Sequence, residues 1–272
     1  MADLEIQGKK AYYETHGSGE PILLLNGIMM STKSWAPFIE NFSASNRLIL
    51  VDFFDQGQSE RMKEPYDHSV QMDLIEGLLD VLKLDMINIC GISYGAEVGL
   101  GFALRHPQRV RRMVLFNGTA RTPPLLADMG HAWNEAAKLD GGLAYYLATI
   151  PMIYSDTFYE REAAWMSMRK ETLLPVFADA EFRERIVRLT NSSETFNVVE
   201  SLGLLQMPVL IVSAEKDNLI PLREQKNMVK KIKNVHHVII PDCGHASMYE
   251  RPMIFSSLTL GFINSKNSDF KI

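Results

Sequence analysis

Ser93 lies at the centre of a Gly-x-Ser-x-Gly pattern, Gly-Ile-Ser-Tyr-Gly at 91–95. An apolar run at 86–90 precedes the pattern, and a helix-like stretch at 96–104 follows it. A strand that turns sharply into a helix needs small residues on both sides of the turning residue, because Cβ atoms there would clash with the neighbouring backbone. The two glycines of the pattern meet that need. We therefore predict a strained turn that presents Ser93 as a nucleophile.

A serine hydroxyl is a weak nucleophile and needs a base, which an acid in turn must orient. Asp217 follows an apolar run at 209–212, and His245 follows the next apolar run at 235–240. If both runs are parallel strands, both residues lie at the sheet edge that carries Ser93. Their order along the chain is neither that of the chymotrypsin triad nor that of the subtilisin triad. We expect His245 to be the base and Asp217 to orient it.

Other acids and histidines have simpler explanations. Glu215 lies two residues before Asp217, but a solvated loop charge is the favoured interpretation. Asp242, three residues before His245, is more typical of a turn. Glu97 falls in the first turn of the expected helix, where the helix dipole favours a negative charge without a catalytic role. The remaining histidines lie in a turn, in a strand run or outside any motif: His16, His68, His106, His131, His236 and His237.

Taken together, the motifs resemble those of the α/β-hydrolase family over about residues 23–262. Besides the serine pattern, they are Leu-Leu-Leu-Asn-Gly at 23–27 with Trp35, Asp52 with Asp-Gln-Gly-Gln-Ser at 55–59, and Gly244-His245 with Glu250 and Pro252. Each motif is loose alone, but their order and spacing are specific. The resemblance implies an α/β fold, with a mainly parallel, doubly wound sheet and a helical cap inserted into it.

Two positions depart from the family pattern. Asn26 stands where the family commonly has His, and Ala96 replaces a common second Gly after the serine motif. By resemblance, the oxyanion hole consists of the backbone N–H groups of Ile28 and Tyr94, so the change to Asn need not remove it. We expect Asn26 to support this loop through side-chain hydrogen bonds.

The strand signals also predict the domain organisation. Strand-like runs alternate with helical stretches such as 71–84 up to Gly118, which indicates a parallel sheet with helices on both faces. After a break at 122–124, residues 125 to about 195 read as helices, and the next strand begins at Pro208. We expect residues 1–119 and 199–272 to form the α/β-hydrolase core. Residues 120–198 would then form the cap, which by resemblance lies over the active site and selects the substrate.

Met29, Met30 and Met248 are expected near Ser93. Because Met side chains fit irregular shapes, we expect the pocket above Ser93 to be apolar and adaptable. The residues expected to contact the substrate are Asn26, Gly27, Met29 and Met248. Arg121 and Arg161 are cap cations that could bind an acidic group, although solvated positions are favoured for both.

Composition narrows the possible partners. The 272 residues are 46% hydrophobic with a formal net charge of -5, which is typical of a folded globular protein. Without a basic patch, we expect neither nucleic acid nor a membrane as a partner. The polar N-terminus and the lack of a long apolar run favour a cytoplasmic location.

Redox chemistry and cofactors are not indicated. The two cysteines, Cys90 and Cys243, are expected to be a reduced, packed pair in preference to a disulfide. The chain has no Cys and His spacing suited to a metal and no Gly-rich phosphate loop. We therefore expect no metal and no other cofactor.

These inferences converge on a serine hydrolase that cleaves a small-molecule carboxylic ester, thioester or lactone with an apolar acyl part through an acyl-enzyme. Alternatives are a C–C bond hydrolase or a cofactor-free lyase or perhydrolase with the same triad, or a hydrolase-like ligand receptor. Haloalkane and epoxide hydrolysis are disfavoured because those reactions use an aspartate where this chain has Ser93. The oligomeric state stays open.

Overall fold

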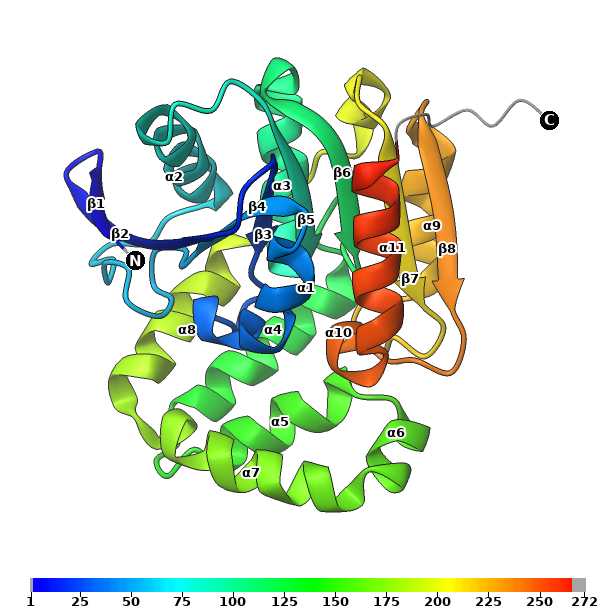
Figure 1. Cartoon of the computed structure of the whole chain (residues 1–272). Coiled ribbons are helices and arrows are strands. Elements are labelled where there is room, and N and C mark those ends of the chain that lie inside the picture. The colour runs from blue at the N-terminus through cyan, green and yellow to red at the C-terminus, as the bar shows by residue number, and fades with distance from the viewer. Residues whose placement is uncertain (1, 266–272) are drawn as a thin grey trace.

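The computed structural model describes residues 2–265, which form one eight-stranded sheet with helices on both faces (Figure 1). The strands are β1 (Ala2–Ile6), β2 (Lys9–His16), β3 (Glu20–Leu25), β4 (Asn46–Val51), β5 (Ile87–Ile92), β6 (Val110–Phe116), β7 (Val209–Ala214) and β8 (Val235–Ile240). They lie in the order β1-β2-β4-β3-β5-β6-β7-β8. Only β1 with β2 and β2 with β4 are antiparallel among these pairs.

The α-helices are α1 (Ile39–Ser43), α2 (His68–Val81), α3 (Tyr94–Arg105), α4 (Pro124–Ala137), α5 (Leu143–Ile153), α6 (Asp156–Arg161), α7 (Ala163–Ala178), α8 (Ala180–Ser192), α9 (Leu222–Lys231), α10 (Ser247–Glu250) and α11 (Pro252–Asn264). Three short 3-10 helices are η1 (Thr32–Phe38), η2 (Pro107–Arg109) and η3 (Val199–Leu204). No helix in the described part of the chain is long and apolar enough to span a membrane.

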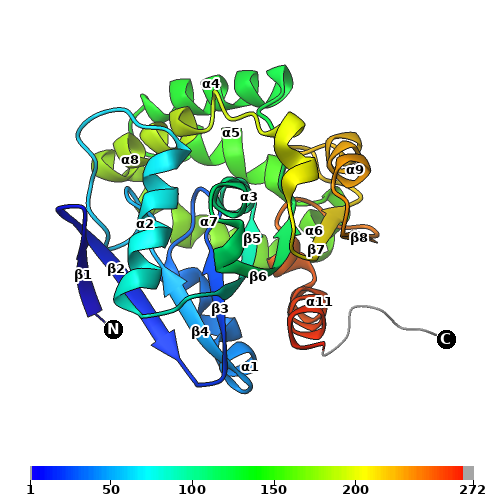
Figure 2. The same ribbon diagram turned by 90° about the horizontal axis from the view of Figure 1, so that it is seen from above.

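Successive strand residues point into two apolar layers, one on each face of the sheet. In β3, Leu23 and Leu25 join the layer that includes side chains of α2 and α3. Ile22 and Leu24 join the opposite layer, which includes Phe42 of α1 and Phe255 of α11. Figure 2 shows α2 and α3 on one side of the sheet and α1 and α11 on the other. Burial on both faces explains why these strands read as unbroken apolar runs, and the predicted doubly wound sheet is confirmed.

Two predicted boundaries shift for local reasons. The strand expected at 86–90 runs instead to Ile92, so that it ends directly at Ser93. The helix expected to begin at residue 71 begins at His68, because the side chain of Asp67 accepts a hydrogen bond from the Ser69 amide at 2.8 Å and caps the helix.

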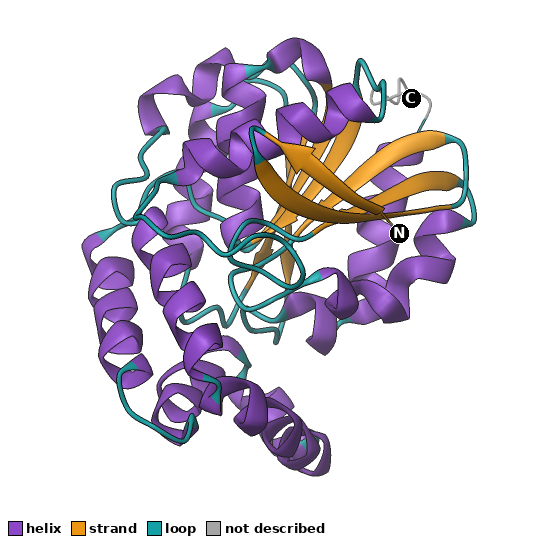
Figure 3. Ribbon diagram, turned by 90° about the vertical axis from the view of Figure 1, so that its left-hand side faces the viewer, coloured by secondary structure: helices purple, strands orange, loops and turns teal. Residues whose placement is uncertain are grey.

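Helices α4 to α8 all lie between β6 and β7 along the chain. The two ends of this segment are hydrogen-bonded side by side: the Val198 amide donates to the Ala120 carbonyl at 2.8 Å, and the Thr122 amide to the Phe196 carbonyl at 2.9 Å. Figure 3 shows these helices grouped beyond one end of the strands. The division into a core and a cap remains a proposal, with this segment as the candidate cap.

The turn at Ser93 brings backbone segments into close contact. Ser93 has φ 53° and ψ −120°, a conformation that costs energy in a residue with a side chain. A Cβ atom on Gly91 would lie 2.5 Å from the carbonyl oxygen of Gly95, and one on Gly95 would lie 2.4 Å from that of Leu25. Both distances are far below van der Waals contact, so both positions require glycine.

We expect Gly95→Ala to lower the stability of the protein. Helix propensity alone would favour Ala over Gly by about 1 kcal/mol, but the clash with the backbone of β3 should cost about 1–3 kcal/mol or more. The melting temperature and the denaturant midpoint, followed by circular dichroism, measure the net effect. Gly261→Ala in α11 is the matched control, because a Cβ there meets no described atom within 4 Å. Equal stabilisation of both variants would contradict the close-packing argument.

Candidate active site

Ser93 follows β5 and directly precedes α3. Its amide donates to the carbonyl of Phe116 at 2.9 Å, which ties the turn to the end of β6. Ser93 and His245 both line one cavity. Among the described residues, no hydrogen bond joins the two side chains. Catalytic hydrogen bonds commonly tighten only when substrate is bound, so this geometry is compatible with a nucleophile and its base.

Asp217 and His245 lie past the carboxyl ends of β7 and β8 and are hydrogen-bonded to each other. His245 Nδ1 lies 2.8 Å from Asp217 Oδ2, and both residues are buried. The other oxygen of Asp217 accepts from the amides of Leu219 and Ile220, each at 2.9 Å. Binding of Nδ1 to the carboxylate leaves Nε2 of His245 as the ring nitrogen available to a nucleophile.

Asn117, which the sequence analysis did not assign to the site, completes the surroundings of Asp217. Its Nδ2 donates to Asp217 Oδ2 at 2.8 Å, and its Oδ1 accepts from the Ser247 hydroxyl at 2.7 Å. Asn117 has φ 51° and directly follows β6. The available sequence signal was a polar, turn-forming residue at the carboxyl end of the strand between those that lead to Ser93 and Asp217. The carboxylate therefore accepts four hydrogen bonds, which offset the cost of burying it.

The buried side-chain amides of Asn26 and Gln56 support the loop after β3. Asn26 donates to the Val51 carbonyl and to Gln56 Oε1, both at 2.9 Å, and accepts from the Trp35 indole at 2.6 Å. Gln56 in turn donates to the carbonyls of Gly27 at 2.9 Å and Ile28 at 3.1 Å. Asn26 is fully buried and does not line the cavity. The expected support of the loop thus has a direct structural basis, whereas contact of Asn26 with a substrate does not.

The predicted oxyanion donors both lie at the cavity. Ile28 belongs to the loop after β3, and Tyr94 is the first residue of α3, where the amide has no partner within the helix. Among the described residues, neither amide donates a hydrogen bond. The Tyr94 hydroxyl points elsewhere, since it is hydrogen-bonded to Ser192 Oγ of α8 at 2.9 Å. The assignment of these two amides remains a proposal.

The cavity that contains Ser93 and His245 measures about 150 Å³. Of the residues predicted to contact substrate, Gly27, Met29 and Met248 line it. Helices α4, α5, α7 and α8 contribute much of the remaining wall, including Leu126, Trp133, Ile150, Leu173 and Phe177. The side chains that surround Ser93 are thus largely apolar.

The two cations considered in the sequence, Arg121 and Arg161, have exposed side chains and do not line the cavity. Arg121 is paired with Glu224 at 3.2 Å, and Arg161 with Glu162 at 3.1 Å. Arg169 lines the cavity instead, with its guanidinium carbon 4.8 Å from the centre of the Tyr249 ring. Glu97 lines it too and is buried, so the helix-dipole explanation of this residue is incomplete.

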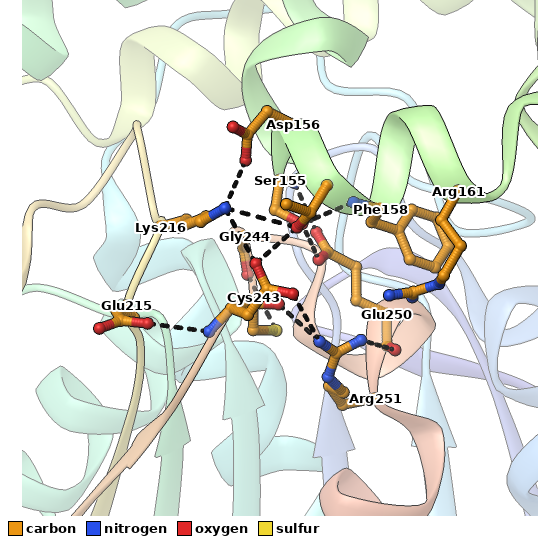
Figure 4. A network of polar contacts seen from close by, with 12 residues as sticks. Ser155, Asp156, Phe158, Arg161, Glu215, Lys216, Cys243, Gly244, Glu250 and Arg251 are labelled. Carbon is orange, nitrogen blue, oxygen red and sulfur yellow. Dashed lines mark hydrogen bonds and ion pairs between the residues drawn. The ribbon is translucent and has the colours of Figure 1, made fainter.

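A polar network joins helix α6 to the loops that carry Asp217 and His245 (Figure 4). Glu250 accepts hydrogen bonds from the Ser155 amide at 2.8 Å and the Ser155 hydroxyl at 2.6 Å. Lys216 contacts Asp156 at 2.7 Å and Asp242 at 2.9 Å. Glu215 and Asp242, two of the acids set aside in favour of Asp217, thus have structural partners, since Glu215 also accepts from the Asp242 amide at 2.9 Å.

Both cysteines are free thiols buried in the same apolar layer. Burial raises the pKa of Cys90 and of Cys243 to about 12. A protonated, enclosed thiol is a poor nucleophile, so the geometry leaves Ser93 as the nucleophile candidate in this part of the structure.

Comparison with known proteins gives a consistent result. A family model described as the alpha/beta hydrolase fold matches residues 20–149 and 162–252. MGS-M2, an alpha/beta hydrolase enzyme from a Medee basin deep-sea metagenome library, is 46% identical, with full coverage of both chains and a TM-score of 0.98. The enol-lactonase from Burkholderia xenovorans LB400 shares the fold at 23% identity, with 97% of this chain and 100% of that chain covered and a TM-score of 0.86.

One similar sequence is the 2-hydroxymuconate semialdehyde hydrolase from Pseudomonas sp. (strain CF600). It is 25% identical over 257 residues, which are 91% of this chain and 88% of that protein. The family match covers most of the chain, including the segments that carry Ser93, Asp217 and His245. The protein therefore belongs to the α/β-hydrolase family and is a hydrolase.

Proposed function

We propose that this protein is a serine hydrolase that cleaves a carboxylic ester, thioester or lactone through an acyl-enzyme. The observation that carries the proposal is the hydrogen bond of Asp217 to His245 at the same cavity that Ser93 enters on its strained turn. An orienting acid, a base with a free Nε2 and a serine at the cavity wall are the groups that acyl transfer requires.

Acylation would follow from these positions. Nε2 of His245 takes the proton of the Ser93 hydroxyl while Oγ forms a bond to the carbonyl carbon of the substrate. The negative charge that develops on the carbonyl oxygen is stabilised by the amides of Ile28 and Tyr94. The tetrahedral intermediate then expels the alcohol, thiol or enol, which receives the proton from His245. Asp217 keeps the imidazole in the required tautomer and stabilises its charged form.

Deacylation repeats the sequence with water. His245 takes a proton from the water molecule, whose oxygen attacks the acyl carbon, and the same amides stabilise the second oxyanion. The intermediate then releases the carboxylic acid, and His245 returns the proton to Ser93 Oγ. The enzyme is restored without any cofactor, because every proton is exchanged between the substrate, water and these side chains.

The largely apolar walls of the cavity favour a substrate with an apolar acyl part. Residues 120–198 supply many of these walls, so we propose that they act as a cap that selects the substrate. The same groups would also serve C–C bond hydrolysis, and the relative named 2-hydroxymuconate semialdehyde hydrolase keeps that reaction as the second candidate. Identification of the products by mass spectrometry distinguishes the two reactions.

Ser93→Ala should lower kcat for p-nitrophenyl esters by several orders of magnitude, because triad members act as a unit. A fluorophosphonate probe should modify Ser93 in the native protein, as located by peptide mass spectrometry. Ser34→Ala is the matched control, since Ser34 lines the same cavity. This variant should still react with the probe and hydrolyse the esters. Turnover that survives Ser93→Ala would remove the basis of the mechanism.

Asp217→Asn should reduce kcat by about 10³- to 10⁴-fold, because the amide no longer holds the productive imidazole tautomer. Glu215→Gln should stay within a few-fold of the native enzyme, since the Gln side-chain oxygen can still accept from the Asp242 amide. Steady-state kinetics of both variants, with circular dichroism to verify folding, make the comparison. A larger loss in Glu215→Gln than in Asp217→Asn would show that the acid is wrongly assigned.

A further inference from the structure

Glu97 lies one helical turn after Ser93. Its amide donates to the Ser93 carbonyl at 3.1 Å, which fixes the spacing between the two residues. Side chains on a helix lean toward its N-terminus, so the side chain of Glu97 is directed toward the end of α3 that carries Ser93. Glu97 lines the same cavity as Ser93 although it is only 4% exposed. An acid thus forms part of the cavity wall close to the proposed nucleophile.

The carboxyl group of Glu97 has no hydrogen-bond partner among the described residues. Nε2 of His68 lies 3.6 Å from Glu97 Oε2, which is longer than a hydrogen bond. Neither ring nitrogen of His68 has a partner in the described part of the chain. The rings of Tyr94 and Phe196 pack edge-on against His68, with centroids at 4.8 Å and 4.7 Å. The ring of His68 is therefore unsatisfied, and the Glu97 carboxyl beside it lines the cavity without a hydrogen-bond partner among the described residues.

Burial in an apolar enclosure favours the uncharged form of both groups. It raises the pKa of the Glu97 carboxyl well above its usual range and lowers the pKa of His68 to about 4. A protonated carboxyl group carries one O–H donor. Leaving such a donor unpaired in an apolar site is costly, so a ligand oxygen that accepts its hydrogen bond would gain affinity over a ligand that presents only hydrocarbon there.

We propose that Glu97 determines substrate specificity by donating a hydrogen bond to a neutral oxygen in the acyl chain, such as a keto, ether or hydroxyl oxygen. This inference rests on the proposed function, because it concerns the acyl group that Ser93 receives. A neutral donor in an apolar wall selects an oxygen-bearing chain over a hydrocarbon chain of equal length. The preferred substrates are therefore oxo- or oxygen-substituted acyl esters, thioesters or lactones.

The shared cavity and the backbone hydrogen bond limit the place of that oxygen. Glu97 and Ser93 line one cavity and are joined across a single turn, so we expect the accepted oxygen about four to five bonds from the scissile carbonyl carbon. A 5-oxohexanoyl ester meets this requirement, and the hexanoyl ester is its hydrocarbon counterpart. The p-nitrophenyl esters of the two acids form a matched pair of probes.

The test compares dissociation constants of the two esters in a Ser93→Ala background, measured by titration calorimetry. With Glu97 present, the 5-oxohexanoyl ester should bind about tenfold more tightly than the hexanoyl ester, as expected for one hydrogen bond to a buried donor. Glu97→Leu should abolish or reverse this preference. Glu97→Gln should retain most of it, because the amide still donates. The ratio of kcat/KM values for the two esters, measured with Ser93 intact, should change in the same way.

Glu194→Leu is the matched control. Glu194 also lines the cavity, but its side chain is half-exposed and is paired with His131 at 3.2 Å. Its replacement should leave the ratio of dissociation constants unchanged. Circular dichroism and fluorophosphonate labelling of the Glu97 variants, with Ser93 intact, verify the fold and the nucleophile.

A ratio that is the same in the native, Glu97→Leu and Glu97→Gln proteins would overturn the proposal, since Glu97 would then have only a structural role. An equal loss of preference in both variants would overturn it too, because Gln keeps a donor. If neither ester is hydrolysed by the native enzyme, the proposed function fails, but the dissociation constants still decide whether Glu97 selects an oxygen-bearing chain.

Discussion

The close approach of the turn at Ser93 to the end of β3 is the constraint on which the rest of the site depends. A Cβ atom on Gly95 would lie within 2.6 Å of the carbonyl oxygens of both Leu25 and Asn26. Because glycine permits this contact, the first turn of α3 lies directly against the loop that carries Ile28. The proposed nucleophile and the proposed oxyanion donors are therefore adjacent through backbone packing, independently of any side chain that reaches across the cavity.

Strand order then places the remaining groups. Ser93, Asn117, Asp217 and His245 follow β5, β6, β7 and β8, which are consecutive neighbours in the parallel part of the sheet. The carboxyl ends of such strands meet at one edge. Asn117 couples two of these loops, because it accepts from Ser247 next to the His245 loop and donates to Asp217. A buried carboxylate with four donors is rigid, so the orientation of the imidazole is fixed before substrate arrives.

The helical segment between β6 and β7 is attached to this edge at several points. Arg188 of α8 forms a bidentate pair with Asp55, and Ser192 of the same helix is hydrogen-bonded to Tyr94 beside the proposed nucleophile. On the opposite side, Ser155 contacts Glu250. The cavity that this segment helps to enclose also contains Glu97, which is 4% exposed, so the acid that we propose to contact the acyl chain lies in the same enclosure as Ser93.

The local sequence pattern alone determined the order of strands and helices along the chain and the turn at Ser93. It also identified Asp217 and His245 as candidates for the acid and the base. Each depends on residues within one strand, one turn or one loop, so periodicity and glycine placement reveal them. The tertiary structure alone decided that Asn117 binds Asp217, that Asn26 faces away from the cavity and that Arg169 lines it. Asn117 and Asp217 are 100 positions apart, and Ser155 and Glu250 are 95 apart. Such pairings depend on how separate elements pack, and no local sequence pattern predicts which distant side chains will be in contact. Glu97 shows the same limit: its place in the first turn of α3 was visible in the sequence, whereas its burial depends on α2, α3 and the segment after α8 closing around it.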